Sequence, residues 1–312
     1  MIGKMSNDGF AARKNKLGVA VGIPAYNERG RVGCLLRQVL CQNDFHPDKI
    51  IVNASGSTDG TQDEIASIAK HVSLIRMIDN SERTGKAEAL NEILEMCDTD
   101  LVIFIDADVK LNAGCLRKIL KPFFSNNSVG VVSGNVAPLT GNGRGFFVYI
   151  SWLERTLHHE LCMDLINRGK PSKVNGTFFA VRRKVIERLP KNTVSDDEYV
   201  SWFAQRKGYS VTYAPNAIVY TKDPENFWDY VAKRRRIFAG HFLIKKTLGY
   251  VVPTTRIDEI APRLLKLSIR EKRRIPYFLF MLFLQFLSYI LALADVSAGN
   301  IPYRYRVESA KF

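Results

Sequence analysis

The most constraining feature of this sequence is an apolar run that ends in two carboxylates one residue apart, Leu101-Val-Ile-Phe-Ile-Asp-Ala-Asp108. A short, continuous apolar run predicts a buried strand of a parallel sheet. Ligands of open α/β sheets bind beyond the carboxyl ends of the strands. Hard divalent cations held there by one or two carboxylates complete their shell with substrate phosphates and water. Asp106 and Asp108 are therefore candidate metal ligands, with turn and helix-cap chemistry as the alternative.

Strand and helix patterns alternate before this pair. We expect strands at residues 17–23, 49–53, 72–78 and 101–105, and helices at 30–41, 59–70 and 86–97. This alternation predicts an α/β fold, a mostly parallel sheet with helices on both faces. Further strands are expected at 129–132, 177–181 and 211–213, and helices at 146–166 and 197–207. Residues 225–246 mix aromatic and basic side chains at helical spacing, which indicates a helix on a membrane surface or over an active site.

Composition limits the kind of partner and compartment. The 312 residues, 46% of them hydrophobic, suffice for one large or two intimate domains. The net charge of +14 favours polyanionic partners, which include nucleic acid, anionic lipid headgroups and nucleotide diphosphates. The five cysteines are odd in number and lack ligand spacing, which indicates neither a disulfide framework nor a structural zinc. We expect a reducing, cytosol-facing compartment.

Two segments of the sequence are relevant to membrane association, one at residues 1–16 and one at residues 276–294. Residues 1–16 are basic but lack an apolar core, so they do not form a secretory signal. Pro276 to Ala294 carry no charge, close to the ~20 residues that cross a bilayer. A buried core helix is the alternative, because Gln285 and Ser288 soften the segment. The basic flank before it predicts a cytoplasmic catalytic domain: Arg263, Lys266, Arg270, Lys272, Arg273 and Arg274.

Five polar motifs follow the predicted strands or open the predicted helices. They are Ile23-Pro-Ala-Tyr-Asn-Glu28, Gly56-Ser-Thr-Asp-Gly-Thr61, Arg83-Thr-Gly-Lys-Ala-Glu-Ala-Leu-Asn91, Asp106-Ala-Asp108 and Ser195-Asp-Asp-Glu198. In this order and spacing they closely resemble the inverting family 2 glycosyltransferases, which have the GT-A fold. The resemblance runs from about residue 17 to 240. It implies a membrane-associated hexosyltransferase that uses a nucleotide-sugar.

The first two strand ends supply candidate contacts to a base and ribose, because short polar side chains and free amides gather there. These candidates are Pro24, Ala25, Tyr26, Asn27, Glu28, Asn53, Ser55 and Asp59. The amide of Asn53 could pair with a base edge, whereas Asp59 is equally a helix cap. Lys86 begins a helix and can point its ammonium at a diphosphate that the helix dipole also favours. A solvated surface lysine is the alternative.

The resemblance also assigns the chemistry. It implies that Asp106 and Asp108, with Ala107 between them at the donor, hold Mg²⁺ or Mn²⁺ against the diphosphate. Asp197 would be the general base and Asp196 a supporting carboxylate, with helix capping as the alternative for both. If the two lie close, their repulsion would raise one pKa.

Two further segments complete the candidate site. Asn175, Gly176 and Thr177 resemble the family segment that lines the donor sugar and acceptor, where a glycine lets the backbone approach closely. An ordinary strand entering a turn is the alternative. Arg236 would grip the leaving diphosphate, since Lys233-Arg-Arg-Arg-Ile237 stands where many members have Gln-x-x-Arg-Trp. A basic membrane-facing helix competes with that interpretation.

Three departures limit what the resemblance implies. Asn53-Ala54-Ser55 replaces the usual acids before Gly-Ser-Thr-Asp-Gly, one of which reads the nucleobase in the family, so this departure puts uracil recognition in doubt. The resemblance still favours a UDP-sugar as the donor, with a GDP-sugar as the alternative. Ile237 replaces the tryptophan of processive synthases, and the chain has one hydrophobic segment rather than several, which favours transfer of a single sugar. Polyprenyl phosphate is already anionic and needs no strong base, so the Asp196-Asp197 pair favours a hydroxyl acceptor.

We therefore expect a metal-dependent inverting transferase that acts on a lipid or glycan hydroxyl at the cytoplasmic membrane face and does not bind nucleic acid. A polyprenyl-phosphate sugar synthase and a non-catalytic, membrane-tethered nucleotide-binding scaffold are the rivals. The expected parts are a basic arm (1–16), a nucleotide-sugar half (17–110), an acceptor half (111–222), amphipathic basic helices on the membrane surface (223–274), a transmembrane or inserted helix (275–296) and a tail (297–312).

Overall fold

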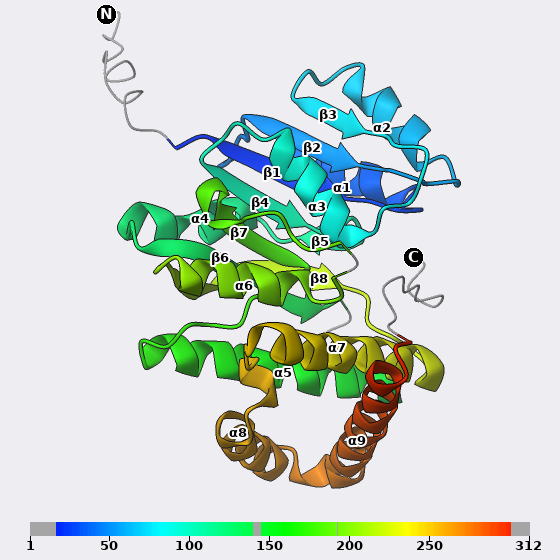
Figure 1. The fold of residues 1–312 in the computed structure, drawn as a ribbon, viewed down its shortest axis with the longest axis vertical. Helices are drawn as coiled ribbons and strands as arrows, with labels where there is room; N and C mark the ends of the chain where they lie inside the picture. The colour runs from blue at the N-terminus through cyan, green and yellow to red at the C-terminus, as the bar shows by residue number, and fades with distance from the viewer. Residues whose placement is uncertain (1–16, 140–144, 192, 301–312) are drawn as a thin grey trace, which may run out of the picture.

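One eight-stranded sheet runs through the upper part of the molecule (Figure 1). The computed structural model describes residues 17–139, 145–191 and 193–300, so the predicted basic arm and residues 301–312 of the predicted tail lie outside it. The strand order is β3-β2-β1-β4-β7-β6-β8-β5, and β5 and β7 run against the other six. The strands are β1 Val19–Pro24, β2 Lys49–Asn53, β3 Ile75–Ile78, β4 Leu101–Ile105, β5 Val109–Leu111, β6 Val129–Pro138, β7 Phe178–Arg182 and β8 Ser210–Thr221.

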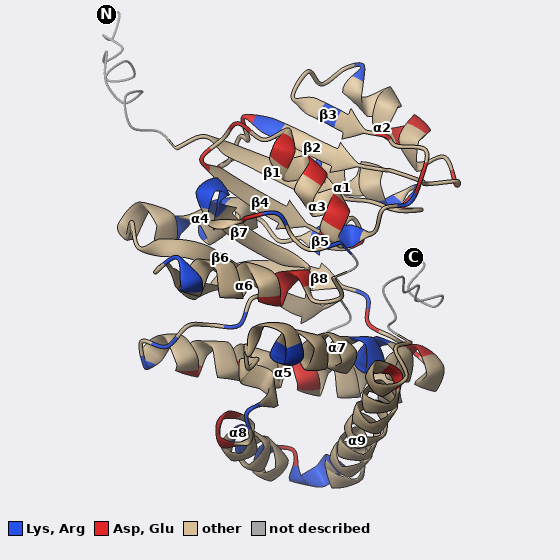
Figure 2. Ribbon diagram, viewed as in Figure 1, with Lys and Arg blue, Asp and Glu red and all other residues tan. Residues whose placement is uncertain are grey.

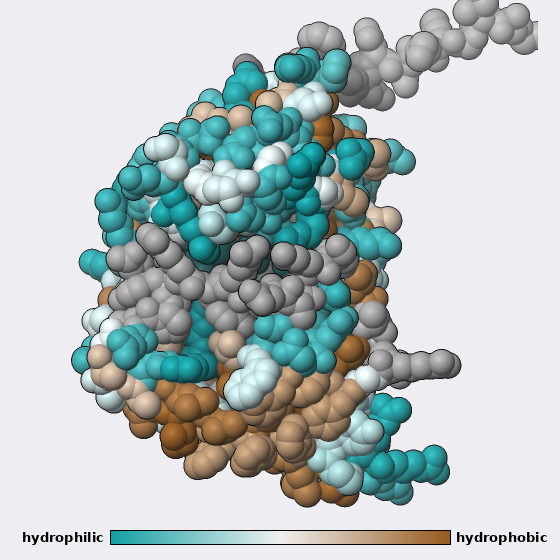
Figure 3. Space-filling model, turned by 90° about the vertical axis from the view of Figure 1, so that its right-hand side faces the viewer, coloured by the Kyte–Doolittle hydropathy of each residue, from teal (hydrophilic) through white to brown (hydrophobic). Residues whose placement is uncertain are grey.

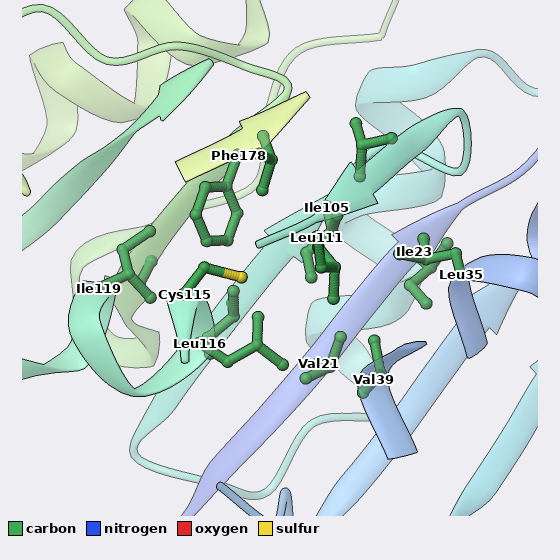
Figure 4. Packing of buried hydrophobic residues seen from close by; sticks show 14 of the residues in the cluster. Val21, Ile23, Leu35, Val39, Ile105, Leu111, Cys115, Leu116, Ile119 and Phe178 are labelled. Carbon is green, nitrogen blue, oxygen red and sulfur yellow. The ribbon is translucent and has the colours of Figure 1, made fainter. Parts of the chain in front are cut away.

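Helices cover both faces of the sheet, which confirms the predicted α/β, mostly parallel fold class. One face carries α1 (Arg31–Leu40), α2 (Thr61–Ala69) and α4 (Cys115–Ser125), and the other carries α3 (Lys86–Glu95) and α6 (Asp196–Arg206). Side chains alternate across a strand: in β4, Ile103 packs on the first face and Phe104 on the second. Figure 4 shows the first core, where residues of β1 and β4 meet α1 and α4.

A separate helical layer lies below the sheet in Figure 1. Its members are α5 (Phe146–Asn167), α7 (Phe227–Leu248), α8 (Ile257–Arg270) and α9 (Ile275–Ser297), and short 3₁₀ turns are η2 (Arg183–Val185), η3 (Pro253–Thr255) and η4 (Lys272–Arg274). These four helices share a third apolar core, formed among others by Leu153, Tyr230, Leu267 and Met281. The layer therefore packs as one unit around its own core.

The sequence located most of these elements but missed two, β5 and α4. Strand β3 begins at Ile75 rather than residue 72, because Val72 ends a turn that closes on the carbonyl of Ala69. Strand β5 has only three residues, too few to show a period, and helices α4 and α8 each contain a proline. An internal proline normally argues against a helix, so α4 and α8 depend on tertiary packing of their apolar faces.

A close approach between β6 and β7 gives a first stability prediction. A Cβ at Gly134 would lie 2.1 Å from Cδ1 of Phe178, whose side chain is fully buried. We expect Gly134→Ala to lower the free energy of unfolding by about 1–3 kcal/mol, because overpacking forces buried side chains off their rotamers. Urea denaturation measures this change. Gly18→Ala is the control, since its nearest atom would lie 3.5 Å away, and equal losses in both variants would contradict the prediction.

Candidate active site

The sheet brings the sequence motifs to one edge. Strands β1, β2 and β4 are parallel neighbours, so their carboxyl ends and the loops that follow lie together. Strand β7 runs antiparallel to β4, so its beginning lies beside the end of β4: Ile105 pairs with Phe178, and the Asp106 amide donates to the carbonyl oxygen of Thr177 at 3.0 Å. The segment 175–177 is thus placed next to Asp106 and Asp108.

Lys86 connects the strand ends to the later acids. It is the first residue of α3, and its Nζ donates to Oδ1 of Asp106 at 2.6 Å and to the carbonyl oxygen of Gly176 at 2.9 Å. The same Nζ lies 3.8 Å from Oδ2 of Asp196. Burial alone would lower the pKa of Lys86, but Asp106 and Asp196 raise it above its ordinary value. A single ammonium therefore bridges three segments of the predicted site.

Negative charge is concentrated at the end of β4. Burial raises the pKa of Asp108, and the neighbouring Asp106 carboxylate adds to that rise. Burial also raises the pKa of Glu28 to about 8; Arg31, with Nε 2.7 Å from Oε2 of Glu28, acts in the opposite direction, while Asp108 and Asp106 increase the shift. A cation at this point would relieve the mutual repulsion of these carboxylates.

The donor set at β4 fits a divalent cation that is shared with a substrate. The carboxylates of Asp106 and Asp108 offer hard oxygen atoms of the kind that divalent cations bind, and a cation between them would offset their repulsion. Within the described parts of the chain, no group of three or more His, Cys, Asp or Glu side chains could hold a metal ion. The remaining ligands would then come from phosphate oxygens and water, which is how Mg²⁺ is commonly bound in phosphate-transfer sites.

The two adjacent acids at the start of α6 face different partners. Asp196 faces Lys86, and burial raises its pKa although that ammonium lowers it. Asp197 accepts from Nζ of Lys173 at 3.2 Å. Burial would raise the pKa of Asp197, but Lys173 outweighs it and holds the pKa below its ordinary value. The two carboxylates are thus unequal in chemistry despite being neighbours in sequence.

Lys173 is a site residue that the sequence analysis missed. Its ammonium also pairs with Glu198, whose Oε1 lies 2.5 Å away, and burial raises the pKa of Glu198 to about 7 against the effect of Lys173. Nε2 of His241 lies 3.9 Å from the same oxygen, and burial lowers the pKa of His241 to about 3. The only available signal was that Lys173 directly precedes Val174-Asn-Gly.

Helix α7 carries the predicted Arg236 towards this cluster. The guanidinium of Arg236 acts electrostatically on Lys86 and on Asp196, which places it at the site. The other basic residues of the run point elsewhere: Lys233 pairs with Asp223 at 2.8 Å, and Arg235 pairs with Asp295 of α9. Acids of other elements thus neutralise two of the basic residues of α7, and its placement on a membrane surface stays a prediction.

The loops after β1 and β2 are bonded to each other. Oδ1 of Asn27 accepts the Thr58 amide at 2.8 Å, and Asn27 is the one non-glycine residue with positive φ (56°) in the described ranges. The Glu28 amide donates to Oγ1 of Thr61 at 2.9 Å. The Asp59 carboxylate accepts hydrogen bonds from the amides of Arg29 and Thr61. This is the capping role that the sequence offered as the alternative to a substrate contact. The backbone of this corner is held in place by these bonds.

Asn53 and Ser55 are turned inward rather than towards a ligand. Asn53 is 2% exposed; its Nδ2 donates to Glu92 of α3, and its Oδ1 accepts the Ser55 amide at 3.1 Å. Oγ of Ser55 accepts the amide of Asn80 at 3.1 Å. The predicted pairing of Asn53 with a base edge is therefore contradicted, because both ends of its amide are already used within the protein.

Tyr26 offers a flat surface at the same corner. The guanidinium carbon of Arg83 lies 3.9 Å from the centre of the Tyr26 ring, and Tyr26 is half-buried. Pro24 and Ala25 complete the end of β1, where the Ala25 amide donates to the carbonyl oxygen of Asn53 at 2.7 Å. Ala107 is 3% exposed between the two aspartates. Arg83 begins one of the five motifs, but nothing in the sequence indicates that it stacks on Tyr26.

Comparison with protein families gives one match over most of the chain. A family model described as "Glycosyltransferase like family 2" matches residues 16–240. Poly-beta-1,6-N-acetyl-D-glucosamine synthase of Staphylococcus aureus (strain MSSA476) is 25% identical over 248 residues, 77% of this chain and 58% of that protein. The synthase of the same name from Staphylococcus epidermidis is 24% identical over 250 residues, 77% of this chain and 59% of that protein. The chain thus spans less than two thirds of the length of these relatives.

Solved structures share the fold. A mannosyltransferase from Pyrobaculum calidifontis in complex with GDP-Man and Mn²⁺ superposes with a TM-score of 0.64 at 20% identity, covering 90% of this chain and 87% of that one. Glucosyl-3-phosphoglycerate synthase from Mycobacterium tuberculosis in complex with Mn²⁺ and UDP-Glc gives a TM-score of 0.53 at 22% identity, covering 73% and 78%. At these identities the likeness establishes the architecture alone.

Proposed function

Because the chain belongs to glycosyltransferase family 2, we propose that it transfers a single sugar, with inversion, from a nucleotide-sugar to a hydroxyl of a lipid or glycan. The reaction uses Mg²⁺ or Mn²⁺ and takes place at the cytoplasmic face of a membrane. UDP-sugars are the favoured donors and GDP-sugars the alternative. A UDP-sugar and a GDP-sugar each accompany Mn²⁺ in one of the structural neighbours.

One observation carries the proposal. Lys86 lies 2.6 Å from Asp106 of the proposed clamp and 3.8 Å from Asp196 of the acid pair. A single displacement requires the diphosphate site and the acid pair that contains the proton acceptor to lie this close together. A nucleotide-binding scaffold would need the clamp and Lys86, but it would have no use for the acid pair beside them.

Charged side chains would bind the diphosphate of the donor. Asp106 and Asp108 would hold the cation, which supplies charge neutralisation to the diphosphate. Lys86, and Arg236 from α7, stabilise the negative charge that grows on the nucleoside diphosphate as it leaves. The nucleoside would contact Tyr26, Asn27 and the loop after β2. Asn53 does not contact it directly, because the Asn53 amide is bonded to Glu92 and Ser55.

On the acceptor side, Asp197 takes the proton of the attacking hydroxyl. Lys173 keeps this carboxylate ionised, so it is available as an acceptor at neutral pH. The acceptor oxygen attacks the anomeric carbon on the face opposite the diphosphate, the bond from that carbon to the diphosphate breaks, and the configuration inverts. Gly176, whose Cβ would lie 3.4 Å from Cβ of Asp197, lets the backbone approach this point.

Nucleoside diphosphate release tests the proposal. Purified full-length protein is incubated with UDP-Glc, UDP-GlcNAc or GDP-Man, with Mn²⁺ or chelator, and with or without a membrane lipid extract. We expect metal-dependent release from one donor, increased by the extract, and a product that carries one added sugar of inverted anomeric configuration. Mass spectrometry counts the sugars, and NMR assigns the anomer.

Each alternative predicts a different result in the same assay. A ladder of products would indicate polymerisation, as named for the staphylococcal relatives. Transfer to polyprenyl phosphate with no transfer to hydroxyl acceptors would indicate the synthase alternative. No release from any donor, together with metal-dependent nucleotide binding, would indicate the scaffold.

A further inference from the structure

Helix α9 presents apolar side chains on two opposite faces. Its buried face, which packs on α5 and α7, carries Phe278, Met281, Leu284, Ser288, Ala292 and Asp295. The opposite face carries a stripe of exposed apolar residues at helical spacing, here called the α9 stripe: Leu279, Phe283, Phe286, Ile290 and Leu293. The helix is long and apolar enough to cross a membrane by length and composition. Figure 3 shows apolar surface gathered over the lower part of this side of the molecule.

Polar side chains fasten α9 to the helices behind it. Gln285, in the middle of this 23-residue helix, donates to Glu154 of α5 and to the hydroxyl of Tyr230 of α7 at 3.1 Å. It accepts from Nε of Arg234 at 2.9 Å. Near the end of the helix, Asp295 accepts two hydrogen bonds from Arg235. These bonds explain why Gln285 interrupts an otherwise apolar segment.

This attachment is incompatible with α9 crossing the bilayer. If α9 spanned, its midpoint would lie at the bilayer centre and would bring Glu154 and Arg234 to the same depth. Charged groups at that depth are strongly unfavourable, and the rest of α7 carries further charge. The Arg235–Asp295 pair would also have to break or enter the membrane. An in-plane position instead leaves the charged helices in water and buries only the α9 stripe.

Basic and aromatic side chains of the kind that contact lipid headgroups lie at the turn before α9. Helix α8 is amphipathic and exposes Leu265 and Ile269, and η4 exposes three cations in a row, which Figure 2 shows at the lower end of the molecule. A hollow of about 460 Å³ opens at this turn. Its lining includes Tyr149, Trp152, Arg270, Lys272, Arg273 and Arg274. Tyrosine, tryptophan and basic residues are typical of the membrane–water interface.

We infer that α8, η4 and α9 form a monotopic docking surface for an anionic lipid bilayer, with α9 lying in the plane of the membrane rather than across it. The α9 stripe enters the acyl boundary, and the η4 cations contact the headgroups. This inference rests on the membrane association in the proposed function and gives it a geometry. Helix α7 carries Arg236 at the active site and also Arg235, which pairs with Asp295 of α9, so the same helix joins the catalytic site to the membrane surface.

Vesicle co-sedimentation tests the docking surface. Full-length protein is mixed with vesicles of phosphatidylcholine alone or with added phosphatidylglycerol. We expect Phe283→Glu with Phe286→Glu to weaken binding to both by about tenfold or more. Phe124→Glu is the control, because Phe124 on α4 is 61% exposed, as Phe283 and Phe286 are 54% and 64% exposed. Loss of binding in the control alone, or no loss in the double variant, would overturn the inference.

The basic turn is tested separately. Replacing Lys272, Arg273 and Arg274 with Ala should weaken binding to phosphatidylglycerol vesicles by about 100-fold, because each cation near an anionic surface contributes about a factor of five. Binding to pure phosphatidylcholine should change little. Equal binding of the variant and the wild type to anionic vesicles would remove the electrostatic part of the inference.

Labelling from outside the vesicle distinguishes in-plane from spanning. Lys272→Cys and Asn300→Cys are introduced singly into a background in which the exposed Cys34 and Cys41 are Ser. Protein is added to preformed vesicles and treated with a membrane-impermeant maleimide. We expect both positions to be labelled. Protection of Asn300→Cys, with labelling of Lys272→Cys, would show a spanning helix and overturn the inference.

Two controls separate this inference from the proposed function. Donor hydrolysis is measured without lipid, so a wild type that hydrolyses donor but binds no vesicle overturns the docking surface and leaves the function intact. If the wild type binds vesicles but hydrolyses no donor, the docking surface is supported and the proposed function is overturned. A stable dimer in sedimentation that binds no vesicle would identify a second copy of the chain as the occupant of the stripe.

Discussion

Asp197→Asn is expected to retain donor and metal binding while slowing sugar transfer by about 10²- to 10⁴-fold, which is the contribution of a positioned proton acceptor. The amide keeps the shape of the side chain but cannot accept the hydroxyl proton. It also removes the negative charge that pairs with Lys173 at 3.2 Å, although Glu198 remains beside that ammonium at 2.5 Å. Single-turnover transfer and donor titration measure the two effects separately.

Asp196→Asn separates the roles of the two acids. Asp196 faces Lys86 rather than Lys173, so Asp196→Asn should slow transfer less than Asp197→Asn does. Asp63→Asn, an exposed acid in the first turn of α2, serves as the matched control. Near wild-type transfer by Asp197→Asn with a severe loss in Asp196→Asn would move the base to Asp196. Wild-type rates in both variants would favour an acceptor that is already anionic, such as a lipid phosphate.

Replacing either clamp residue is expected to remove the metal dependence of donor binding. Asp108→Ala should weaken nucleotide-sugar binding in Mn²⁺ by at least about tenfold and change it little in chelator, because the cation joins protein to diphosphate. Asp106→Ala should do the same in Mn²⁺. In chelator it should bind the donor slightly better, because Asp106 no longer occupies the ammonium of Lys86 at 2.6 Å. Isothermal titration with and without Mn²⁺ measures both.

Stability must be followed alongside these titrations. Asp63→Ala is the control here for loss of a carboxylate from the surface, and urea unfolding shows whether Asp106→Ala or Asp108→Ala perturbs the fold. Equal losses of donor affinity in Mn²⁺ and in chelator would indicate that both carboxylates are structural. The metal proposal would then fail, whereas the Lys86–Asp196 contact would remain to explain diphosphate binding.

Local pattern was sufficient for much of the fold. The apolar run before Asp106 is long enough to be buried on both sides, and the structure places β4 at Leu101–Ile105 in the middle of the sheet. Helices at 30–41 and 86–97 were found because their apolar period matches one buried face. Helix α4 was not predicted because Pro122 lies inside it and proline is unfavourable within a helix. Its packing on β6 and β8 explains its stability.

The contacts inside the site could not be read from sequence in the same way. Asn53 was expected to face a base, but it faces Glu92, a residue 39 positions later on α3. Lys173 was not singled out, although it sets the charge state of Asp197, which lies 24 positions away. Both interactions depend on how two elements cross in space. A side chain's spacing along its own element says nothing about that.

Periodicity and strand-end motifs are local properties, so they were sufficient to predict a doubly covered α/β sheet of the family 2 glycosyltransferases with acids beyond a buried strand. That β7 runs against β4 and brings Gly176 to Lys86 could be seen only in three dimensions, because strand direction depends on the connections between elements. The contacts of α9 likewise show that this apolar helix is bonded to α7. A helix that spans a membrane and one that lies in its plane can have the same length and apolarity. The contacts of Gln285 and Asp295 with charged residues of α7 are therefore what favours the in-plane position.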